Sequence, residues 1–224
     1  INLILENNKD YGSKISNDKY NIEFVSANPT GPMHVGHCRG AIFGDVLANL
    51  LKFNGNTVIK EYYINDYGNQ IDNFVESVFL RIKEIKFKEK FPVKDNLYPG
   101  QYIKEIAKKI LDKNKNINFD NYDKIFNFLK EKSLIESMEL IKNDLNSLGI
   151  SHDNFISETD LVNKDLVNKT VKKLIDRKFV EEGYLPPPKG EINENWKKTK
   201  RLIFKSTLFD DDTDRALQKN DGRS

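Results

Sequence analysis

A tight turn near the start of this 224-residue chain joins a strand-like run to a helix-like run, and it carries two histidines three positions apart. Upstream of the turn, residues 21–26 (NIEFVS) alternate in the manner of a short strand. Downstream, apolar residues recur at helical spacing until Gly55, namely Ile42, Val46, Leu47, Leu50 and Leu51. Open α/β folds bind nucleotides at junctions of this kind, so residues 27–37 (ANPTGPMHVGH) predict a nucleotide site.

The composition of the turn suits a triphosphate. Pro29, Gly31 and Pro32 favour a compact turn, and Gly36 leaves the backbone open to a flat base or ribose. His34 and His37 lie about 60° apart around the helix axis, so both imidazoles can reach one ligand. Because imidazole can donate a hydrogen bond to a phosphate oxygen in either charge state, the pair can stabilise charge that develops on an α-phosphate.

Two other interpretations of the histidines remain open. They could bind a metal together with Cys38, although the zincin spacing is missing and the one further histidine is His152. They could also only cap the helix, without any ligand. A Walker-type phosphate loop is absent from the sequence.

The charge balance and cysteine content narrow the class of protein. With 36 basic and 34 acidic residues the formal net charge is +2, which by itself does not predict a nucleic-acid coat. The lysine runs at 86–90 and 108–109 are interpreted as solvated helix faces in preference to an RNA groove. The single cysteine excludes an internal disulfide and indicates a reducing compartment, and no apolar run approaches the ~20 residues of a membrane span. We therefore expect a cytoplasmic protein with no membrane segment.

The order of predicted elements indicates an α/β fold. A second strand at residues 57–64 completes a βαβ unit, whereas residues 70–183 show helical stripes that no strand of comparable strength interrupts. A strand predicted at 201–207 is expected to rejoin the first sheet. The expected organisation is a linker at 1–20, the first half of a nucleotide-binding domain at 21–80, a mostly helical insertion at 81–185 and the start of the second half at 186–224. The fold class is thus an open parallel sheet interrupted by a largely helical insertion.

Four segments in order resemble one known family. Residues 23–40, around the two histidines, resemble the HIGH region of class I aminoacyl-tRNA synthetases in the arginyl-tRNA synthetase form. The family's later motifs have counterparts at residues 61–70 (EYYINDYGNQ), 186–190 (PPPKG) and 204–215 (FKSTLFDDDTDR). The resemblance implies the Rossmann-like, HUP-type nucleotide-binding fold of that family.

The resemblance also implies roles for individual residues. Glu23 and Asn28 would hold the substrate arginine, and a carboxylate is suited to the planar fork of a guanidinium. Asp66, in the turn after the second strand, is expected to face the same cleft. The catalytic residues would be His34 and His37, within an ATP-binding set that comprises Pro29, Thr30, Gly31, His34, Gly36 and His37.

The implied reaction has two steps. The carboxylate of L-arginine attacks the α-phosphate of ATP, which enters with Mg²⁺, and the arginyl group then passes to the terminal ribose of tRNA(Arg). Such a reaction requires positioning and charge stabilisation but no side-chain nucleophile and no resident metal site. A monomer is expected. Two alternatives are an inactive synthetase-like module for RNA binding or assembly, and a small-molecule nucleotidyltransferase of the same superfamily.

Two departures from the family pattern limit these expectations. Where the family usually has Phe-Gly-Asp-Asp, this chain has residues 209–212 as FDDD, which affects a glycine-dependent turn. The second catalytic loop and the anticodon-binding domain lie beyond residue 224 in the family. The start at Ile1 and the stop after an Asp-Gly turn predict an internal piece of a longer protein, which alone would bind ATP weakly and would not aminoacylate tRNA.

Overall fold

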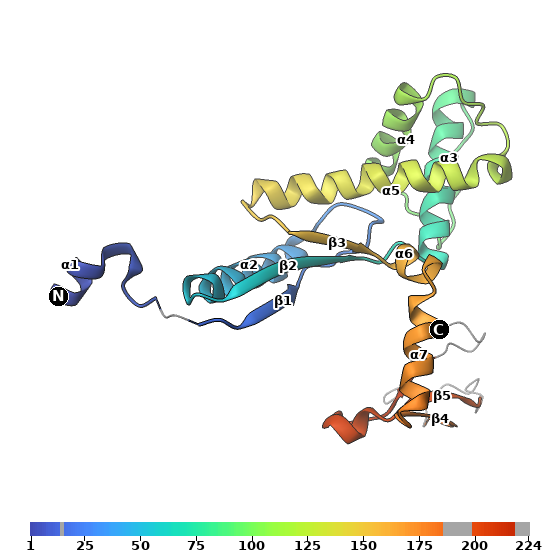
Figure 1. Cartoon of the computed structure of the whole chain (residues 1–224). Helices are drawn as coiled ribbons and strands as arrows, with labels where there is room; N and C mark the ends of the chain where they lie inside the picture. The colour runs from blue at the N-terminus through green and yellow to red at the C-terminus, as the bar shows by residue number, and fades with distance from the viewer. Residues whose placement is uncertain (14–15, 186–198, 218–224) are drawn as a thin grey trace. The chain divides into compact units, whose positions relative to one another are not determined.

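The computed structural model describes residues 1–13, 16–185 and 199–217 (Figure 1). The chain divides into two compact units, Ile1–Thr159 and Asp160–Ser224. The PPPKG motif at 186–190 lies outside the described residues. Among the described residues, none of the helices combines the length and the apolarity needed to cross a membrane.

The first unit is built on the predicted βαβ unit. After an exposed short helix α1 (Asn2–Asn7) and a 3-10 turn (Asn8–Asp10), the elements are β1 (Lys19–Glu23), α2 (Val35–Phe53) and β2 (Thr57–Ile64). The two strands pair in parallel, in the register that joins Lys19 to Thr57 and Glu23 to Glu61. The prediction of strand, helix and strand is confirmed, although β1 ends at Glu23 and not at Ser26.

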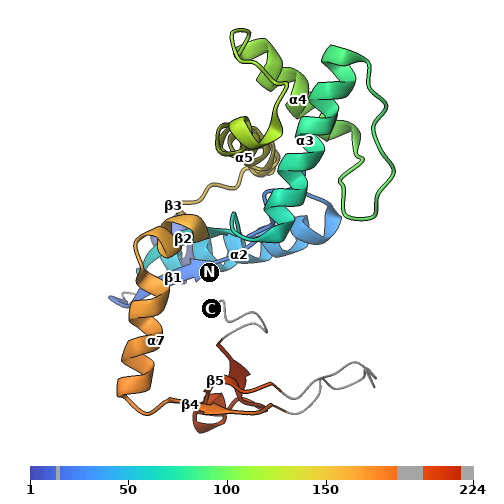
Figure 2. The same cartoon turned by 90° about the vertical axis from the view of Figure 1, so that its right-hand side faces the viewer.

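Three long helices separate β2 from the next strand of the same sheet. They are α3 (Asn69–Phe87), α4 (Gln101–Lys113) and α5 (Tyr122–Ser147), and they form a group to one side of the strands (Figures 1 and 2). Ile71, Phe74, Ile103, Ile106 and Leu129 belong to their shared buried core. The expected fold class, a parallel sheet interrupted by a helical insertion, is confirmed.

The sheet resumes at a strand that the sequence did not predict. β3 (Asn154–Ser157) pairs in parallel with β2, which gives the order β1-β2-β3. The helical stripes of residues 70–183 did not reveal this strand, which has half the length of β2. β3 has four residues, too few for an alternating pattern to stand out, and its position depends on pairing with the distant β2.

The second unit contains a separate antiparallel sheet. The helix α6 (Glu158–Asn163) crosses the boundary between the units, and α7 (Leu166–Asp176) precedes the strands β4 (Val180–Gly183), β5 (Arg201–Phe204) and β6 (Arg215–Ala216). The strand predicted at 201–207 corresponds to β5, but it pairs antiparallel with β4 and β6. The prediction that it rejoins the first sheet is wrong, because nearby strands in sequence supply its partners.

The FDDD departure falls on a left-handed residue. Asp210 follows a 3-10 helix (Ser206–Phe209) and has φ = 65°. Asp tolerates this conformation better than most residues because its short polar side chain can bond locally. Beyond the turn, Asp211 accepts hydrogen bonds from Arg215 at 2.6 and 2.8 Å. The turn that glycine usually makes in the family is thus formed here with an aspartate.

The helix α2 packs on the sheet through small residues and not through its large apolar ones. Its buried residues are Ala41, Gly44 and Ala48, whereas the predicted stripe is largely exposed, with Ile42 51% and Leu50 56% accessible. A Cβ on Gly44 would lie 2.3 Å from the ring of Phe24, so glycine is required for this approach. The helix is predicted correctly, but its inward face is not.

A buried ion pair joins the same helix to the central strand. Lys60 of β2 is 7% exposed, and its Nζ donates to Asp45 at 2.6 Å and to Asn49 at 3.2 Å. Its backbone N–H donates to Asp153, directly before β3, at 2.8 Å. These bonds satisfy a charge that would be costly to bury alone.

The loop between β1 and α2 is held by side chains from three other elements. Tyr62 of β2 donates its hydroxyl hydrogen to the carbonyl of Ala27 at 2.7 Å, and Tyr102 of α4 donates to the carbonyl of Thr30 at 3.0 Å. Asp144 of α5 accepts the N–H of Met33 at 3.2 Å. The helical insertion therefore helps to fix the loop that carries the predicted nucleotide site.

The third histidine, His152, is half-buried among aromatic rings. The ring of His152 lies 4.3 Å from that of Phe24, 5.4 Å from Tyr62 and 5.7 Å from Phe155, centroid to centroid. Both of its ring nitrogens are buried without a hydrogen-bond partner among the described residues. Burial lowers the pKa of His152, and the positive charge of Lys60 lowers it further. The backbone of Phe24 and the carboxylates of Asp45 and Asp153 act in the opposite direction without reversing the shift. His152 is therefore neutral in the folded protein near neutral pH.

We expect Gly44→Ala and Gly40→Ala to change stability in opposite directions. The added methyl at Gly44 meets the Phe24 ring and should cost about 1–3 kcal/mol. At Gly40, one turn earlier on α2, a Cβ has nothing within 4 Å, so alanine should stabilise the helix by about 0.5–1 kcal/mol. Urea unfolding measures both values. Equal effects at the two positions would contradict the close packing of α2 on β1.

We expect His152 to make the protein less stable in acid. Because its pKa is lowered on folding, the unfolded chain binds the proton more readily, and the free energy of unfolding should fall as the pH drops from 7 through the range below 6.5. His152→Phe keeps an aromatic ring but cannot titrate, so this variant should lose less stability between pH 7 and 5. An unchanged loss in the variant would assign the acid sensitivity to other groups.

Candidate functional site

The two histidines begin the helix α2 and cap it reciprocally. His34 is the N-cap residue, with extended backbone angles, and its Nδ1 accepts the N–H of His37 at 3.4 Å. The Nδ1 of His37 in turn accepts the N–H of His34 at 3.3 Å. The arrangement is a capping box in which two imidazoles replace the usual hydroxyl and carboxylate. The histidines therefore cap the helix, and capping uses one nitrogen of each ring.

The capping bonds determine which nitrogen can serve a ligand. A backbone N–H can only donate, so each Nδ1 must be an unprotonated acceptor and each Nε2 carries the hydrogen. The rings stack with centroids 3.7 Å apart and planes 16° apart. Burial lowers the pKa of His37, and the neighbouring His34 lowers it further. The pair thus presents two Nε2–H donors beside the N–H groups of the first helical turn.

Gly36 makes room for this stack. A Cβ at Gly36 would lie 2.9 Å from Cε1 of His34, which is closer than real Cβ contacts. Gly31, earlier in the same loop, has a comparable role, because a Cβ there would lie 3.1 Å from the ring of Tyr102. In this structure both glycines accommodate protein rings. The predicted approach of a base or ribose to Gly36 stays a prediction.

Glu23 is the last residue of β1 and has an exposed side chain. Its carboxylate oxygen Oε1 accepts a hydrogen bond from the hydroxyl of Ser26. Ser26 and the preceding Val25 have positive φ angles, 40° and 69°. Such conformations cost on the order of 1–3 kcal/mol each outside glycine, and they occur where surrounding bonds impose them. The chain after β1 thus makes a strained bend, which brings the hydroxyl of Ser26 back to the carboxylate of Glu23.

The remaining residues of the turn lie close to the end of β2. The Oδ1 of Asn28 accepts from the side-chain amide of Asn65 at 3.2 Å. The N–H of Thr30 donates to the carbonyl of Asn28 at 2.7 Å, which closes a tight turn around the buried Pro29. The compact turn predicted from its prolines and glycine is present. The amide of Asn28 is oriented by a neighbouring amide and remains exposed.

Asp66 joins β2 to the segment that follows β3. Its Oδ2 accepts from the hydroxyl of Ser157 at 2.6 Å, and its Oδ1 accepts from the N–H of Thr159 at 2.8 Å. The hydroxyl of Thr159 also donates to the carbonyl of Asp66 at 3.0 Å. Both carboxylate oxygens therefore hold the ends of two strands together. A role of Asp66 in arginine binding stays a prediction.

The structure groups the predicted residues into two clusters at the carboxyl ends of the strands. One is the imidazole pair of His34 and His37 at the start of α2. The other comprises two separate bonds near the strand ends, from Ser26 to Glu23 and from Asn65 to Asn28. The sequence did not reveal the supporting residues Ser26, Tyr62, Asn65, Tyr102 and Asp144. Ser26 lies within the family-like run, so its position could have suggested a role. The others act through distant contacts without a sequence signal.

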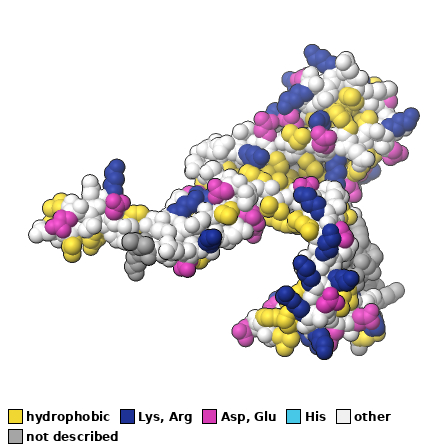
Figure 3. Space-filling view, viewed as in Figure 1, with side chains coloured by type: hydrophobic (Ala, Val, Ile, Leu, Met, Phe, Trp, Pro, Cys, Tyr) yellow, Lys and Arg dark blue, Asp and Glu magenta, His cyan; other side chains and the backbone are white. Residues whose placement is uncertain are grey.

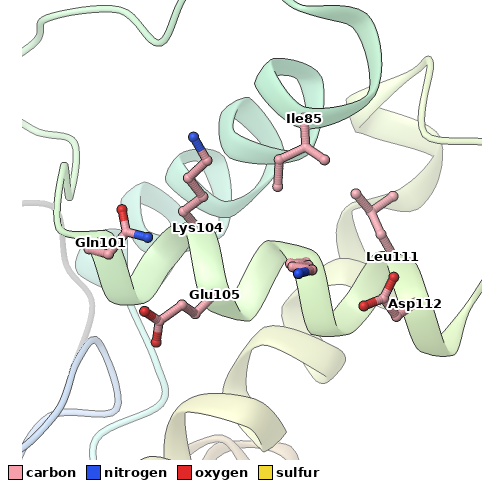
Figure 4. Close-up of a pocket in the computed structure, with 7 residues that line it drawn as sticks. Ile85, Gln101, Lys104, Glu105, Leu111 and Asp112 are labelled. Atoms are coloured by element: carbon pink, nitrogen blue, oxygen red, sulfur yellow. The ribbon is translucent and has the colours of Figure 1, made fainter.

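Other surface features lie apart from these clusters. Among the described residues, no group of three or more His, Cys, Asp or Glu side chains is arranged to hold a metal ion. A shallow hollow of about 470 Å³ lies on α4 and α3 (Figure 4), and its lining residues are Ile85, Gln101, Lys104, Glu105, Lys108, Leu111 and Asp112. On the face shown in Figure 3, basic and acidic side chains alternate over the helical insertion. Lys109 and Lys113 both face Glu136, at 3.6 and 2.5 Å.

The sequence matches one protein family over most of its length. A family model described as tRNA synthetases class I (R), catalytic domain, matches residues 1–184. A curated arginine–tRNA ligase from Pelagibacter ubique (strain HTCC1062) is 56% identical over 224 residues, which are 99% of this chain and 39% of the relative. One from Wolbachia pipientis subsp. Culex pipiens (strain wPip) is 50% identical over 208 residues, 92% of this chain and 36% of the relative. The chain thus spans well under half the length of these relatives.

Solved structures agree with the sequence matches. A structure assigned as an arginyl-tRNA synthetase from Campylobacter jejuni superposes with a TM-score of 0.79 at 31% identity, over 100% of this chain and 46% of that chain. The arginyl-tRNA synthetase of Thermus thermophilus shares the fold, with a TM-score of 0.53 at 17% identity over 94% of this chain and 34% of that chain. These findings confirm the resemblance seen in the four sequence motifs. The chain belongs to the family of class I tRNA synthetase catalytic domains, in the form that the family model marks R, for arginine.

Proposed function

We propose that this chain forms part of the catalytic domain of an arginine–tRNA ligase, which activates L-arginine with ATP and transfers the arginyl group to tRNA(Arg). The observation that carries the proposal is the stacked pair of His34 and His37, whose Nε2–H groups remain available to donate. They begin a helix one loop away from the carboxylate of Glu23. The curated relatives at 50% and 56% identity support arginine as the amino acid.

In the first step, the chain contributes binding and charge stabilisation. Glu23 accepts the guanidinium of arginine, and the exposed amide of Asn28 offers further polar atoms to the substrate. The Nε2–H groups of His34 and His37, with the N-terminus of α2, donate to the phosphate oxygens of ATP. As the arginine carboxylate attacks the α-phosphorus and pyrophosphate leaves, these donors stabilise the developing negative charge. Asp66 holds β2 beside β3 in this proposal, and its role in arginine binding stays a separate prediction.

The lowered pKa of His37 suits this task. Because the pKa of His37 is lowered, the ring does not repel His34, and the two donors can converge on one phosphate. A bound phosphate would favour protonation and strengthen the hydrogen bonds. The nucleotide enters as its Mg²⁺ complex, and the residues of this chain are not assigned to the metal. Pro29, Thr30, Gly31 and Gly36 shape the wall on which ATP lies.

The setting of the proposed activity follows from the same features. Cys38 is a free cysteine, which suits a reducing compartment, and we place the enzyme in the cytoplasm. We propose a monomer as the acting form. The likeness to curated arginine–tRNA ligases supports this proposal over an inactive RNA-binding module or a small-molecule nucleotidyltransferase.

We expect His37→Ala to reduce arginine-dependent exchange of pyrophosphate into ATP by about a hundredfold or more, because a preorganised donor to the developing charge is lost. The exchange is measured with tRNA present, in a full-length protein that carries this segment. Unchanged exchange would refute the role of His37.

Cys38→Ala is the matched control for this variant. Cys38 is the next residue of the same helical turn, and it is not assigned to ATP or arginine. The control should retain a rate of pyrophosphate exchange within about twofold of that of the parent protein. A change of this size is usual for a substitution outside the site. A loss as large as that of His37→Ala would instead support a site that uses both residues, such as a metal site.

A further inference from the structure

The strained bend after β1 contains a hydroxyl with two partners. In a parallel pair with this register, the N–H of Tyr63 would donate to the carbonyl of Phe24. Instead, that carbonyl accepts the N–H of Ser26 at 3.0 Å, and the N–H of Tyr63 donates to the side-chain oxygen of Ser26 at 3.0 Å. The hydroxyl hydrogen of Ser26 is then directed to Oε1 of Glu23. The hydroxyl oxygen of Ser26 thus takes the place of a backbone carbonyl as the acceptor for Tyr63. The hydroxyl hydrogen of Ser26 donates to the carboxylate of Glu23.

The bend is imposed on residues that do not favour it. Val25 is β-branched and has φ = 69°, a conformation in which such side chains are rare, and Ser26 has φ = 40°. Glycine at either position would relieve the strain. Residues held in such conformations by their surroundings cluster at functional sites. The two strained residues lie between Phe24 and Ala27, and the burial of both neighbours holds the backbone in this conformation.

We propose that Ser26 is a positioning residue that orients the carboxylate of Glu23 for the guanidinium of arginine. This inference rests on the proposed function, in which Glu23 binds the substrate. A hydroxyl that already accepts a backbone N–H has its donor direction restricted, so it fixes the plane of the carboxylate. Oε2 and the second lone pair of Oε1 then remain to accept the two-pronged fork of a guanidinium. Without this bond, an exposed glutamate at the end of a strand would exchange among several rotamers.

A double-mutant cycle between Ser26 and Glu23 tests the proposal. In a full-length protein that carries this segment, Ser26→Ala should raise the KM for arginine about tenfold, as expected for a lost hydrogen bond to a charged group. The KM for ATP should change less than about twofold, because the imidazole pair is untouched. In the background of Glu23→Ala, the further change Ser26→Ala should alter the KM for arginine by less than about twofold.

Ser26→Gly distinguishes the hydroxyl from the backbone strain. Glycine adopts φ = 40° without penalty, so this variant loses the hydroxyl and its bond to the N–H of Tyr63 but relieves the backbone strain at position 26. It should raise the KM for arginine as much as Ser26→Ala does. If Ser26→Ala unfolds, the cycle is run with Ser26→Gly.

The outcomes separate the two proposals. If Glu23→Ala leaves the KM for arginine unchanged, the proposed arginine site is wrong. If Glu23→Ala raises it but neither Ser26 variant does, the arginine site stands and the positioning role is wrong. Two further results would overturn the positioning role. In one, the Ser26 substitution changes the KM for arginine equally with and without Glu23. In the other, it raises the KM for arginine and the KM for ATP in parallel, since Ser26 would then act only through the sheet.

Discussion

The contact between Phe24 and Gly44 determines where the candidate site is formed. The phenyl ring occupies the space in which any side chain at position 44 would lie, and this allows α2 to approach β1 closely. Glu23 directly precedes this ring, and His34 and His37 begin the helix that it supports. Because Phe24 is buried, the chain after β1 has a fixed starting point for the loop. The positions of carboxylate and imidazoles therefore depend on one glycine on the helix.

The loop between these anchors is supported from outside the βαβ unit. Tyr102 and Asp144, which bond Thr30 and Met33, belong to helices inserted between β2 and β3. Tyr62 adds a bond to Ala27 from the core of the sheet. Loop backbone that would otherwise be solvated or mobile gains three fixed hydrogen bonds, each with a modest net contribution to stability but with strong directional preference. The helical insertion is thus part of the support of the nucleotide turn as well as an addition to the sheet.

The histidine pair shows how a structural role and a ligand-binding role coexist. Each Nδ1 satisfies a backbone N–H at the start of α2, which fixes the rings and their tautomer. The same bonds leave Nε2–H as the outward donor, so capping prepares the rings for an anion. Asp66 has a mainly structural role, because both of its carboxylate oxygens already accept hydrogen bonds from the end of β3 and the residues that follow it. At Glu23 a single hydroxyl donor leaves acceptor capacity for a cationic ligand.

The sequence by itself determined the βαβ unit, the helical character of the insertion, the compact turn and the family, because local periodicity, turn residues and ordered motifs carry that information. It did not determine the inward face of α2, where small residues and not Ile42 or Leu50 meet the sheet, since the partner surface is contributed by Phe24. It also missed β3 and misassigned the partners of β5, because strand pairing depends on distant chain segments and short strands leave a weak pattern. The hydrogen bonds from Ser26, Tyr102 and Asp144 were likewise decided by the tertiary structure alone, since they depend on which backbone groups the folded chain brings within reach.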